Sequence, residues 1–223
     1  MKLEVLADER AAAARCAELI AAAGREAVAE RGAFSLALSG GRSPWGMLAR
    51  LSDDPTMPWA ETELFQVDER IAAPGSDERN LTHMVLGLSL DHQASLRPMP
   101  VTQRDLEGAA RSYEESLPER LDLIHLGIGP DGHTASLVPG DPVLDVADRR
   151  VALTESPYQG LRRMTLTYPE LSAARSILWL ITGEAKREAL RRLLEGDRSI
   201  PAGRVENEEM MVVADSVAAG DSR

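Results

Sequence analysis

The chain has 223 residues, 43% hydrophobic and 4% aromatic, which excludes a disordered protein and predicts a core of Ala, Leu, Val and Ile. Its formal net charge of −11 disfavours non-specific binding to nucleic acid or to an anionic membrane surface. Cys16 is the only cysteine, no apolar segment reaches the roughly 18 residues of a membrane helix, and the first residues lack a signal-peptide pattern. We therefore expect a cytoplasmic protein that binds neither nucleic acid nor membranes.

Helical and strand patterns alternate along most of the chain. Helices are predicted at 8–30, with Asp8 as the N-cap, from about 44 to 51, from 81, and at 105–117, 169–174 and 183–194. Strands are predicted at 34–38, 64–67, 121–126, 150–154, 164–167, 176–182 and 210–214. This alternation favours one α/β domain over residues 1–223, a doubly wound, mostly parallel sheet flanked by helices in a Rossmann-like arrangement.

The first polar motif is S-G-G-R-S-P at 39–44, between a predicted strand and a predicted helix. Its backbone N–H groups, the hydroxyls of Ser39 and Ser43, the helix dipole and the Arg42 guanidinium can together hold a phosphate. The same residues also fit a simple tight turn, so the motif alone leaves both interpretations open. It is neither a P-loop nor a G-x-G-x-x-G fingerprint.

A second polar motif, D-E-R at 68–70, directly follows the strand predicted at 64–67. A charged tripeptide in this setting is most often a solvated loop. Its place at the carboxyl end of a strand, shared with the two glycine motifs, favours a ligand site instead. A polar loop at 74–80 follows and ends at Asn80.

The third motif lies in the stretch 121–140, L-D-L-I-H-L-G-I-G-P-D-G-H-T-A-S-L-V-P-G. An apolar run predicts a buried parallel strand, and the glycines after it predict a tight turn with close approach to a ligand. Residues 134–136 are predicted to begin a short helix whose free N–H groups attract anions. Asp131 and His133, two residues apart, lie within this turn.

Of the four histidines, only His133 lies in a glycine turn beside a carboxylate. His125 is expected to pack within its apolar strand, and His83 and His92 are expected at the surface, without metal-ligand spacing. Asp131 can orient the His133 imidazole and stabilise its protonated form, as a general base requires. Because no G-x-S-x-G setting marks a nucleophilic serine, we favour activated water over an acyl-enzyme.

Lysine occurs only at Lys2 and Lys186. Because the acidic chain repels anions at long range, a phosphate-bearing ligand would need a local group of cations. Lys186, expected in the first turn of the helix at 183–194, is a candidate for that group.

Taken in order, these motifs resemble the 6-phosphogluconolactonase family over nearly the full length of the chain. The matching segments are S-G-G-R-S-P at 39–44, V-D-E-R at 67–70 followed by Asn80, G-I-G-P-D-G-H-T-A-S-L-V-P-G at 127–140, R-R-M-T-L-T at 162–167, G-E-A-K at 183–186 and I-P-A at 200–202. The chain departs from the family pattern at Arg79, where a serine is common, at Val138, where a phenylalanine is common, and at 156–163, which lacks the usual proline-rich approach.

The resemblance implies hydrolysis of 6-phospho-D-glucono-1,5-lactone, a small phosphosugar lactone, to 6-phosphogluconate without a metal or organic cofactor. It implies four catalytic residues: the base His133, its support Asp131, and the cations Arg70 and Lys186. The substrate-binding positions that it implies are Gly40, Gly41, Arg42, Ser43, Asp68, Asn80, Gly129 and Arg163. Which cation contacts the phosphate and which the oxyanion stays open, and the protein is expected to be a monomer or a small homo-oligomer.

Two other functions are weighed against this one. Glucosamine-6-phosphate deaminase shares the fold and a D-G-H turn, but its family continues with an I-A-F-N-E-P-like segment that supplies a catalytic glutamate. This chain has no acidic residue between His133 and Asp141. A non-catalytic sugar-phosphate sensor on the same scaffold would be expected to lose the base, whereas Asp131 and His133 are both present.

Overall fold

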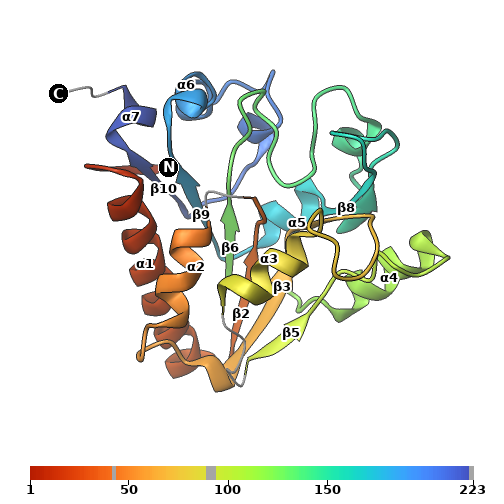
Figure 1. The fold of residues 1–223 in the computed structure, drawn as a ribbon, viewed down its shortest axis with the longest axis horizontal. Helices are drawn as coiled ribbons and strands as arrows, with labels where there is room; N and C mark the ends of the chain where they lie inside the picture. The colour runs from red at the N-terminus through yellow and green to blue at the C-terminus, as the bar shows by residue number, and fades with distance from the viewer. Residues whose placement is uncertain (42–43, 89–93, 221–223) are drawn as a thin grey trace.

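A parallel sheet of seven strands forms the centre of the computed structural model, which describes residues 1–41, 44–88 and 94–220 (Figure 1). In order across the sheet, the strands are β1 (Lys2–Leu6), β10 (Met210–Asp215), β9 (Ser176–Ile181), β6 (Leu123–Leu126), β2 (Phe34–Leu38), β3 (Thr62–Gln66) and β5 (Ser95–Arg97). Every neighbouring pair in this sheet is parallel. The predicted α/β fold is confirmed, and the two edge strands β1 and β5 are additions that the sequence pattern did not indicate.

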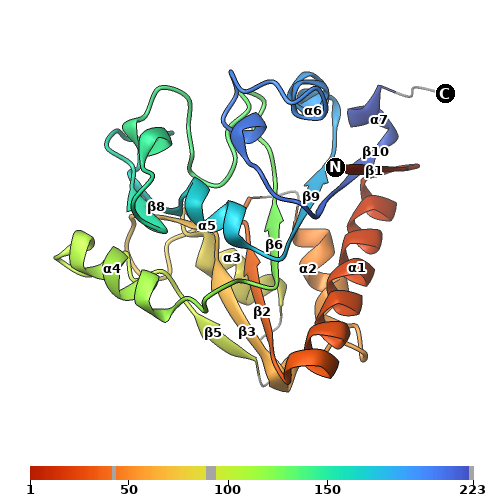
Figure 2. The same ribbon diagram turned by 180° about the vertical axis from the view of Figure 1, so that it is seen from behind.

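Helices cover both faces of this sheet. The described helices are α1 (Glu9–Arg31), α2 (Trp45–Ser52), α3 (Asn80–Gly87), α4 (Leu106–Ser116), α5 (Tyr168–Ala173), α6 (Arg187–Leu194) and α7 (Ser216–Ala219), with 3-10 turns η1 (Trp59–Glu61), η2 (Pro142–Asp145), η3 (Glu184–Lys186) and η4 (Ala202–Arg204). One buried cluster joins α1, α2 and α3 to the sheet, and a second joins α4 to α7 to its other face, as Figures 1 and 2 show from opposite sides.

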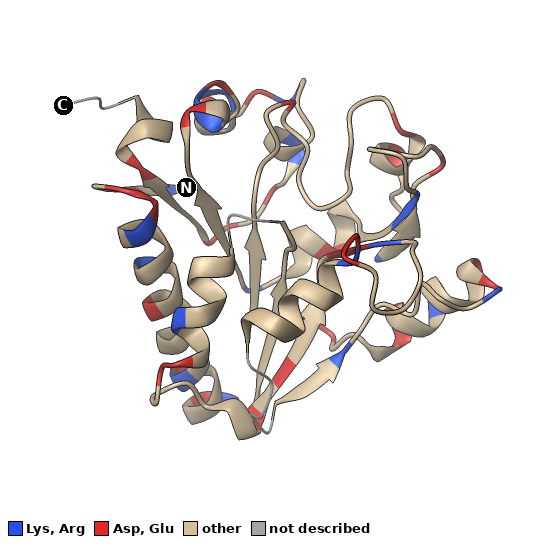
Figure 3. Ribbon diagram, in the orientation of Figure 1, with Lys and Arg blue, Asp and Glu red and all other residues tan. Residues whose placement is uncertain are grey.

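The alternation of side chains along the strands builds these two layers. In β2, Leu36 and Leu38 belong to the cluster under α1 and α2, whereas Ala37 belongs to the cluster on the opposite face. The central strands β2 and β6 carry no charged residue, and charged side chains lie mainly on helices and loops (Figure 3). Both faces of the sheet are therefore apolar, as expected of a parallel sheet that is covered on both sides.

The long helix α1 follows the sequence prediction closely. The Asp8 carboxylate accepts a hydrogen bond from the Ala11 N–H at 2.7 Å, and Gly32, at φ 78°, ends the helix. Gly24 lies inside the helix without breaking it. A Cβ at this position would come within 3.1 Å of the Phe34 ring. The glycine thus permits close packing of α1 against β2.

The sheet reverses its strand order between β2 and β6, which are neighbours at its centre. From β2 the chain continues outward to β3 and β5, and from β6 it continues in the other direction to β9 and β10. In open α/β sheets, ligands bind beyond the carboxyl ends of the strands at such a reversal. Residues 39–41 and 127–128, which follow these two strands, therefore lie at the expected ligand position.

A second, antiparallel sheet stands beside this position. It contains β4 (Asp68–Arg70), β8 (Arg163–Leu166) and β7 (Val151–Leu153) in the order β4-β8-β7. No strand was predicted at 68–70, because a three-residue strand has too few residues to show a period and its pairing with β8 is long-range. Arg70 and Arg163 face each other in the register of β4 and β8.

Candidate active site

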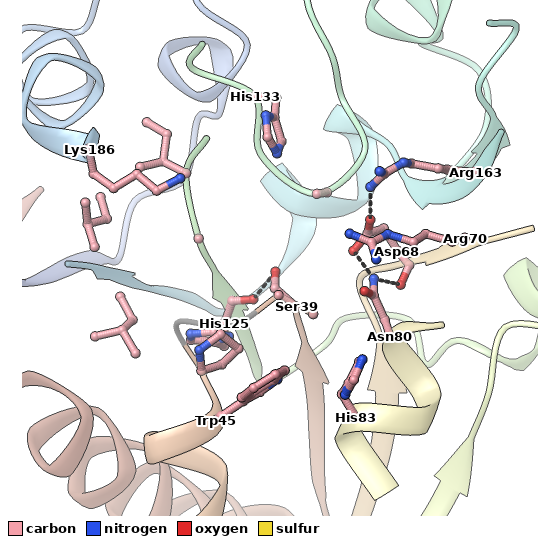
Figure 4. A pocket seen from close by; sticks show the side chains of 18 of the residues that line it. Ser39, Trp45, Asp68, Arg70, Asn80, His83, His125, His133, Arg163 and Lys186 are labelled. Atoms are coloured by element: carbon pink, nitrogen blue, oxygen red, sulfur yellow. Dashed lines mark hydrogen bonds and ion pairs between the residues drawn. The ribbon is translucent and has the colours of Figure 1, made fainter. Parts of the chain in front are cut away.

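A cavity of about 750 Å³ opens at the carboxyl ends of the central strands (Figure 4). Loops that follow β2, β6 and β9 line it, together with β4 and the start of β8. Among the residues that line it are eight predicted site residues: Gly40, Gly41, Asp68, Arg70, Asn80, His133, Arg163 and Lys186. The structure thus gathers motifs from five separate parts of the chain around one space.

His133 and Asp131 form a hydrogen-bonded pair at the edge of this cavity. Asp131 Oδ1 lies 2.6 Å from His133 Nδ1 and accepts a weaker hydrogen bond from the His133 backbone N–H at 3.2 Å. Burial raises the pKa of Asp131, but its hydrogen bonds and charge interaction with His133 outweigh this and leave the pKa below its ordinary value. An ionised Asp131 keeps the proton of a neutral imidazole on Nδ1, which leaves Nε2 free to accept a proton.

A glycine turn at 129–132 holds the backbone of His133 and leaves room for its imidazole. The Gly129 N–H donates to the His133 carbonyl at 2.8 Å, and the Gly132 N–H donates to the Gly129 carbonyl at 2.9 Å. A Cβ on Gly129 would lie 2.0 Å from His133 Nδ1, and Gly132 has a φ of 82°, so both positions need glycine. Gly129 is not among the residues lining the cavity, but its lack of a side chain leaves room for the His133 ring.

The short helix predicted from 134 to 136 is not present. Thr134 and Leu137 instead form an isolated antiparallel bridge, and Ala135 takes a φ of 50°. The Ser136 hydroxyl is fully buried and donates to Asp68 Oδ2 at 2.5 Å. A tight turn whose polar groups are used internally replaces the expected helix, so no helix N-terminus attracts an anion here.

Asp68 and Asn80 join the cavity wall to helix α3. Asn80 Nδ2 donates to Asp68 Oδ1 at 3.1 Å and to the Asp68 carbonyl at 3.0 Å. Burial raises the pKa of Asp68, an effect that the Ser136 hydroxyl and the Arg163 guanidinium partly offset. Gly40 packs against this pair, because a Cβ there would lie 2.1 Å from the Asn80 side chain. The glycine loop after β2 is thereby fitted to the start of α3.

The middle residue of the D-E-R motif does not face the cavity. Glu69 is fully buried and accepts hydrogen bonds from the Asn80 and Leu81 N–H groups at 2.8 and 2.9 Å, at the beginning of α3. It also accepts from Arg79 Nε at 3.1 Å, in an ion pair that is almost completely buried. Arg79, a departure from the family pattern, therefore partners the carboxylate that caps α3.

Arg70 and Arg163 provide positive charge at one side of the cavity (Figure 4). Arg163 Nη1 lies 3.8 Å from Asp68 Oδ2, and Arg70 Nη1 lies 3.6 Å from Glu78 Oε2, so neither arginine has a tight carboxylate partner among the residues that the structure describes. The Nε atoms of both are buried without a hydrogen-bond partner in the described part of the chain. Burial lowers the pKa of Arg163, although a guanidinium stays protonated. Both arginines thus keep donors available for an anion.

Lys186 approaches the cavity from the opposite side (Figure 4). Gly183, at φ 88° and ψ 155°, turns the chain after β9, and its N–H donates to Asp215 Oδ1 at 3.0 Å. Lys186 then ends the 3-10 turn η3, where a continuous helix had been predicted from 183. Burial lowers the pKa of Lys186, while the charge of Asp131 acts in the other direction. The ammonium makes no ion pair with the residues that the structure describes.

Three residues in or beside the cavity were not predicted to belong to the site. His83, expected at the surface, lines the cavity and lies 5.1 Å from the Trp45 ring. His125 is buried as expected, but it also lines the cavity. Tyr158 contacts both Asp131 and His133, at 3.0 and 3.3 Å, although no motif singled it out. Arg42 and Ser43, predicted to bind the substrate, lie outside the described residues.

This arrangement can activate a water molecule and bind a doubly charged anion in one cavity. The base and three cations surround the same space, although the chain as a whole is strongly acidic. Within residues 1–41, 44–88 and 94–220, no group of three or more His, Cys, Asp or Glu side chains could hold a metal ion. No helix in the same ranges has the length and apolar character needed to cross a membrane.

Comparison with known proteins adds independent findings. The 6-phosphogluconolactonase of Synechocystis sp. is 36% identical over 178 residues, which cover 74% of this chain and 73% of the relative. The crystal structure of 6-phosphogluconolactonase from Thermotoga maritima is 27% identical, with a TM-score of 0.85 and coverage of 96% and 98% of the two chains. A monomeric glucosamine-6-phosphate deaminase has a TM-score of 0.86 at 21% identity over 99% of each chain, so it shows the fold alone.

A family described as glucosamine-6-phosphate isomerases/6-phosphogluconolactonase matches residues 7–214. This match covers nearly the whole chain and includes every motif around the cavity. The chain belongs to this family.

Proposed function

We propose that this protein hydrolyses 6-phospho-D-glucono-1,5-lactone to 6-phosphogluconate, a step of the oxidative pentose phosphate pathway. The observation that carries the proposal is that His133, paired with Asp131, lines the same cavity as Arg70, Arg163 and Lys186. A lactone ester needs an activated water and oxyanion stabilisation, and the phosphate needs a further cation. The similarity to 6-phosphogluconolactonases supports the same activity.

In the proposed reaction, His133 Nε2 takes a proton from water as the water oxygen attacks the lactone carbonyl carbon. The imidazolium is stabilised by Asp131, which already holds Nδ1 at 2.6 Å. When the tetrahedral intermediate collapses, the bond from that carbon to the ring oxygen breaks, and the proton on Nε2 passes to the ring oxygen. The products are a carboxylic acid, which ionises, and a free hydroxyl group, so His133 returns to its neutral form.

The three cations account for the two anionic sites that the reaction requires. Arg70 and Arg163 on one side and Lys186 on the other provide positive charge at separate places in the cavity. A phosphate at one place and the developing oxyanion at the other would hold the lactone carbon near His133. Binding energy from the non-reacting phosphate then positions the ring for attack.

The site favours the lactonase over the deaminase of the same fold. The first acidic residue after His133 is Asp141, and its carboxylate accepts hydrogen bonds from the Val143 and Ser156 N–H groups at 2.9 and 3.0 Å. It is therefore engaged in the loop and does not supply the extra catalytic acid expected of the deaminase. The presence of the complete Asp131–His133 pair likewise disfavours a non-catalytic sensor.

The test measures turnover of freshly generated 6-phosphogluconolactone, coupled to 6-phosphogluconate dehydrogenase and corrected for spontaneous ring opening. Replacing His133 with Ala should reduce kcat by roughly 10²- to 10⁴-fold, the usual contribution of a positioned general base. Lactone turnover by the wild type no faster than the background would refute the proposed function. Full turnover by His133→Ala would retain the function and remove His133 as the base.

A further inference from the structure

Tyr158 lies between the Asp131–His133 pair and Arg163, in the segment 156–163 that departs from the family pattern. Its hydroxyl donates to Asp131 Oδ2 at 3.0 Å and lies 3.3 Å from His133 Nδ1. Its ring meets the His133 ring edge to face, with centroids 5.1 Å apart, and the Arg163 guanidinium carbon lies 5.1 Å from the Tyr158 centroid. One side chain therefore contacts the proposed base, its carboxylate and an anion-binding arginine.

The hydroxyl completes the hold on the Asp131 carboxylate. Asp131 Oδ1 is used by His133, and Oδ2 by Tyr158, so the two oxygens have separate partners. The Asp131 side chain is 37% exposed, and without the phenol its second oxygen would be free to rotate toward solvent. Burial and the nearby Asp131 raise the pKa of Tyr158, which keeps the phenol protonated and able to donate.

The ring and backbone of Tyr158 support Arg163. Arg163 Nη2 donates to the Tyr158 carbonyl at 3.2 Å, and its guanidinium lies over the ring at a cation–π distance. The contact with Asp68, at 3.8 Å, is longer than a normal hydrogen bond. Tyr158 thus holds the guanidinium without neutralising its charge, as binding of an anion requires.

A tight turn fixes Tyr158 in this place. The Tyr158 N–H donates to the Leu161 carbonyl at 3.0 Å, and the residues between them, Gln159 and Gly160, have φ values of 53° and 86°. Positive φ at both central positions is typical of the hairpin turns that match the twist of paired strands. The turn precedes β8 directly, so the ring position is set by the strand that carries Arg163.

We propose that Tyr158 is a positioning residue that couples the Asp131–His133 pair to the anion-binding Arg163. Its hydroxyl orients the carboxylate that serves the base, and its ring and carbonyl hold the guanidinium that binds the anionic part of the substrate. The inference rests on the proposed lactonase function. It assigns separate effects to the hydroxyl and to the ring, which two substitutions can tell apart.

Tyr158→Phe keeps the ring and loses only the hydroxyl. Its kcat should fall about 10-fold with KM within about twofold of wild type, as loss of one hydrogen bond to a charged group predicts. The acid limb of its kcat/KM profile should move to higher pH, because Asp131 without the phenol donor holds the imidazolium more strongly. Tyr158→Leu should also raise KM, because Arg163 loses the ring beneath it.

Tyr168→Phe is the matched control, since the Tyr168 hydroxyl also makes one hydrogen bond, to the Pro201 carbonyl at 2.9 Å, away from the cavity. It should keep the wild-type kcat and pH profile. A Tyr158→Phe enzyme with wild-type kcat and an unshifted acid limb would overturn the inference, as would an equal loss of kcat in Tyr168→Phe.

An NMR titration of His133 separates this inference from the proposed function, because it needs no substrate. Wild type without lactone turnover would refute the function, and the titration would still test the coupling. A higher His133 midpoint in Tyr158→Phe than in wild type supports the role of the hydroxyl. Identical midpoints would overturn it.

Discussion

Replacing His125 with leucine tests whether burial of its imidazole in the central strand β6 lowers the free energy of unfolding. The His125 side chain is 1% exposed, and neither ring nitrogen has a hydrogen-bond partner within the described residues. Its neighbours in the flanking strands are Leu38 and Leu178. Because leucine matches these neighbours and needs no partner, we expect His125→Leu to stabilise the protein at neutral pH by about 1–3 kcal/mol.

The effect should grow as the pH falls. Burial lowers the pKa of His125 from 6.5 to about 4, so between these values the unfolded chain binds a proton that the folded protein does not. Titration of His125 therefore leaves the free energy of unfolding unchanged above the unfolded pKa. It lowers that free energy as the pH falls toward the folded pKa. Linkage then gives a loss of about 2 kcal/mol by about pH 5 and about 3 kcal/mol in total.

Urea denaturation of both proteins, without ligand, measures this difference at several pH values between about 7.5 and 5. All other titratable groups are shared, so their contributions cancel in the comparison. The difference in unfolding free energy between His125→Leu and wild type should widen by about 2 kcal/mol across this range. A constant difference would show that the folded imidazole takes up a proton as readily as the unfolded one, and would refute the reasoning.

Two pairs of substitutions test the assignment of the charged residues. Glu69→Gln should lower the unfolding free energy by about 3–5 kcal/mol because it leaves Arg79 buried without its partner. Arg79→Ser should lower it less, because Glu69 keeps its backbone donors. Urea denaturation that gave the reverse order would contradict this assignment. Lys186→Met should lower kcat/KM about 10- to 150-fold, the loss of one charge-assisted hydrogen bond, with little change in unfolding free energy. Lys2→Met, at the only other lysine, is its control, and equal activity of the two variants would remove Lys186 from the site.

The parallel sheet could be predicted because its strands are buried on both faces and therefore read as short apolar runs. The run at 34–38 coincides with β2, and the run at 176–182 is one residue longer than β9. The largely exposed edge strand β1 and the three-residue strands β4 and β5 gave no such signal. Residues 68–70 become a strand only because β8 pairs with them across a separation of more than 90 residues, which no local pattern records.

The residues of the site could be predicted better than their roles. Glycine motifs at the ends of β2 and β6 marked the cavity, because parallel strands bring their carboxyl ends to one edge of a sheet. The sequence could not divide the D-E-R motif into a cavity-facing Asp68, a helix-capping Glu69 and a cavity-facing Arg70. That division follows from the side-to-side alternation of β4 and from the position of α3, both of which are tertiary facts.

Tyr158 shows most clearly why motif matching stops short of the mechanism. Its segment was notable in the sequence only for lacking the proline-rich approach usual in the family, yet its hydroxyl and ring contact Asp131 and Arg163, which belong to two different motifs. A side chain that links two motifs belongs to neither, so a comparison made one motif at a time passes over it. An acidic chain that must bind an anion also needs the cations of its site held in place without being neutralised. At Arg163, an aromatic face and a backbone carbonyl meet that need. A carboxylate at hydrogen-bond distance would instead compete with the substrate for the guanidinium.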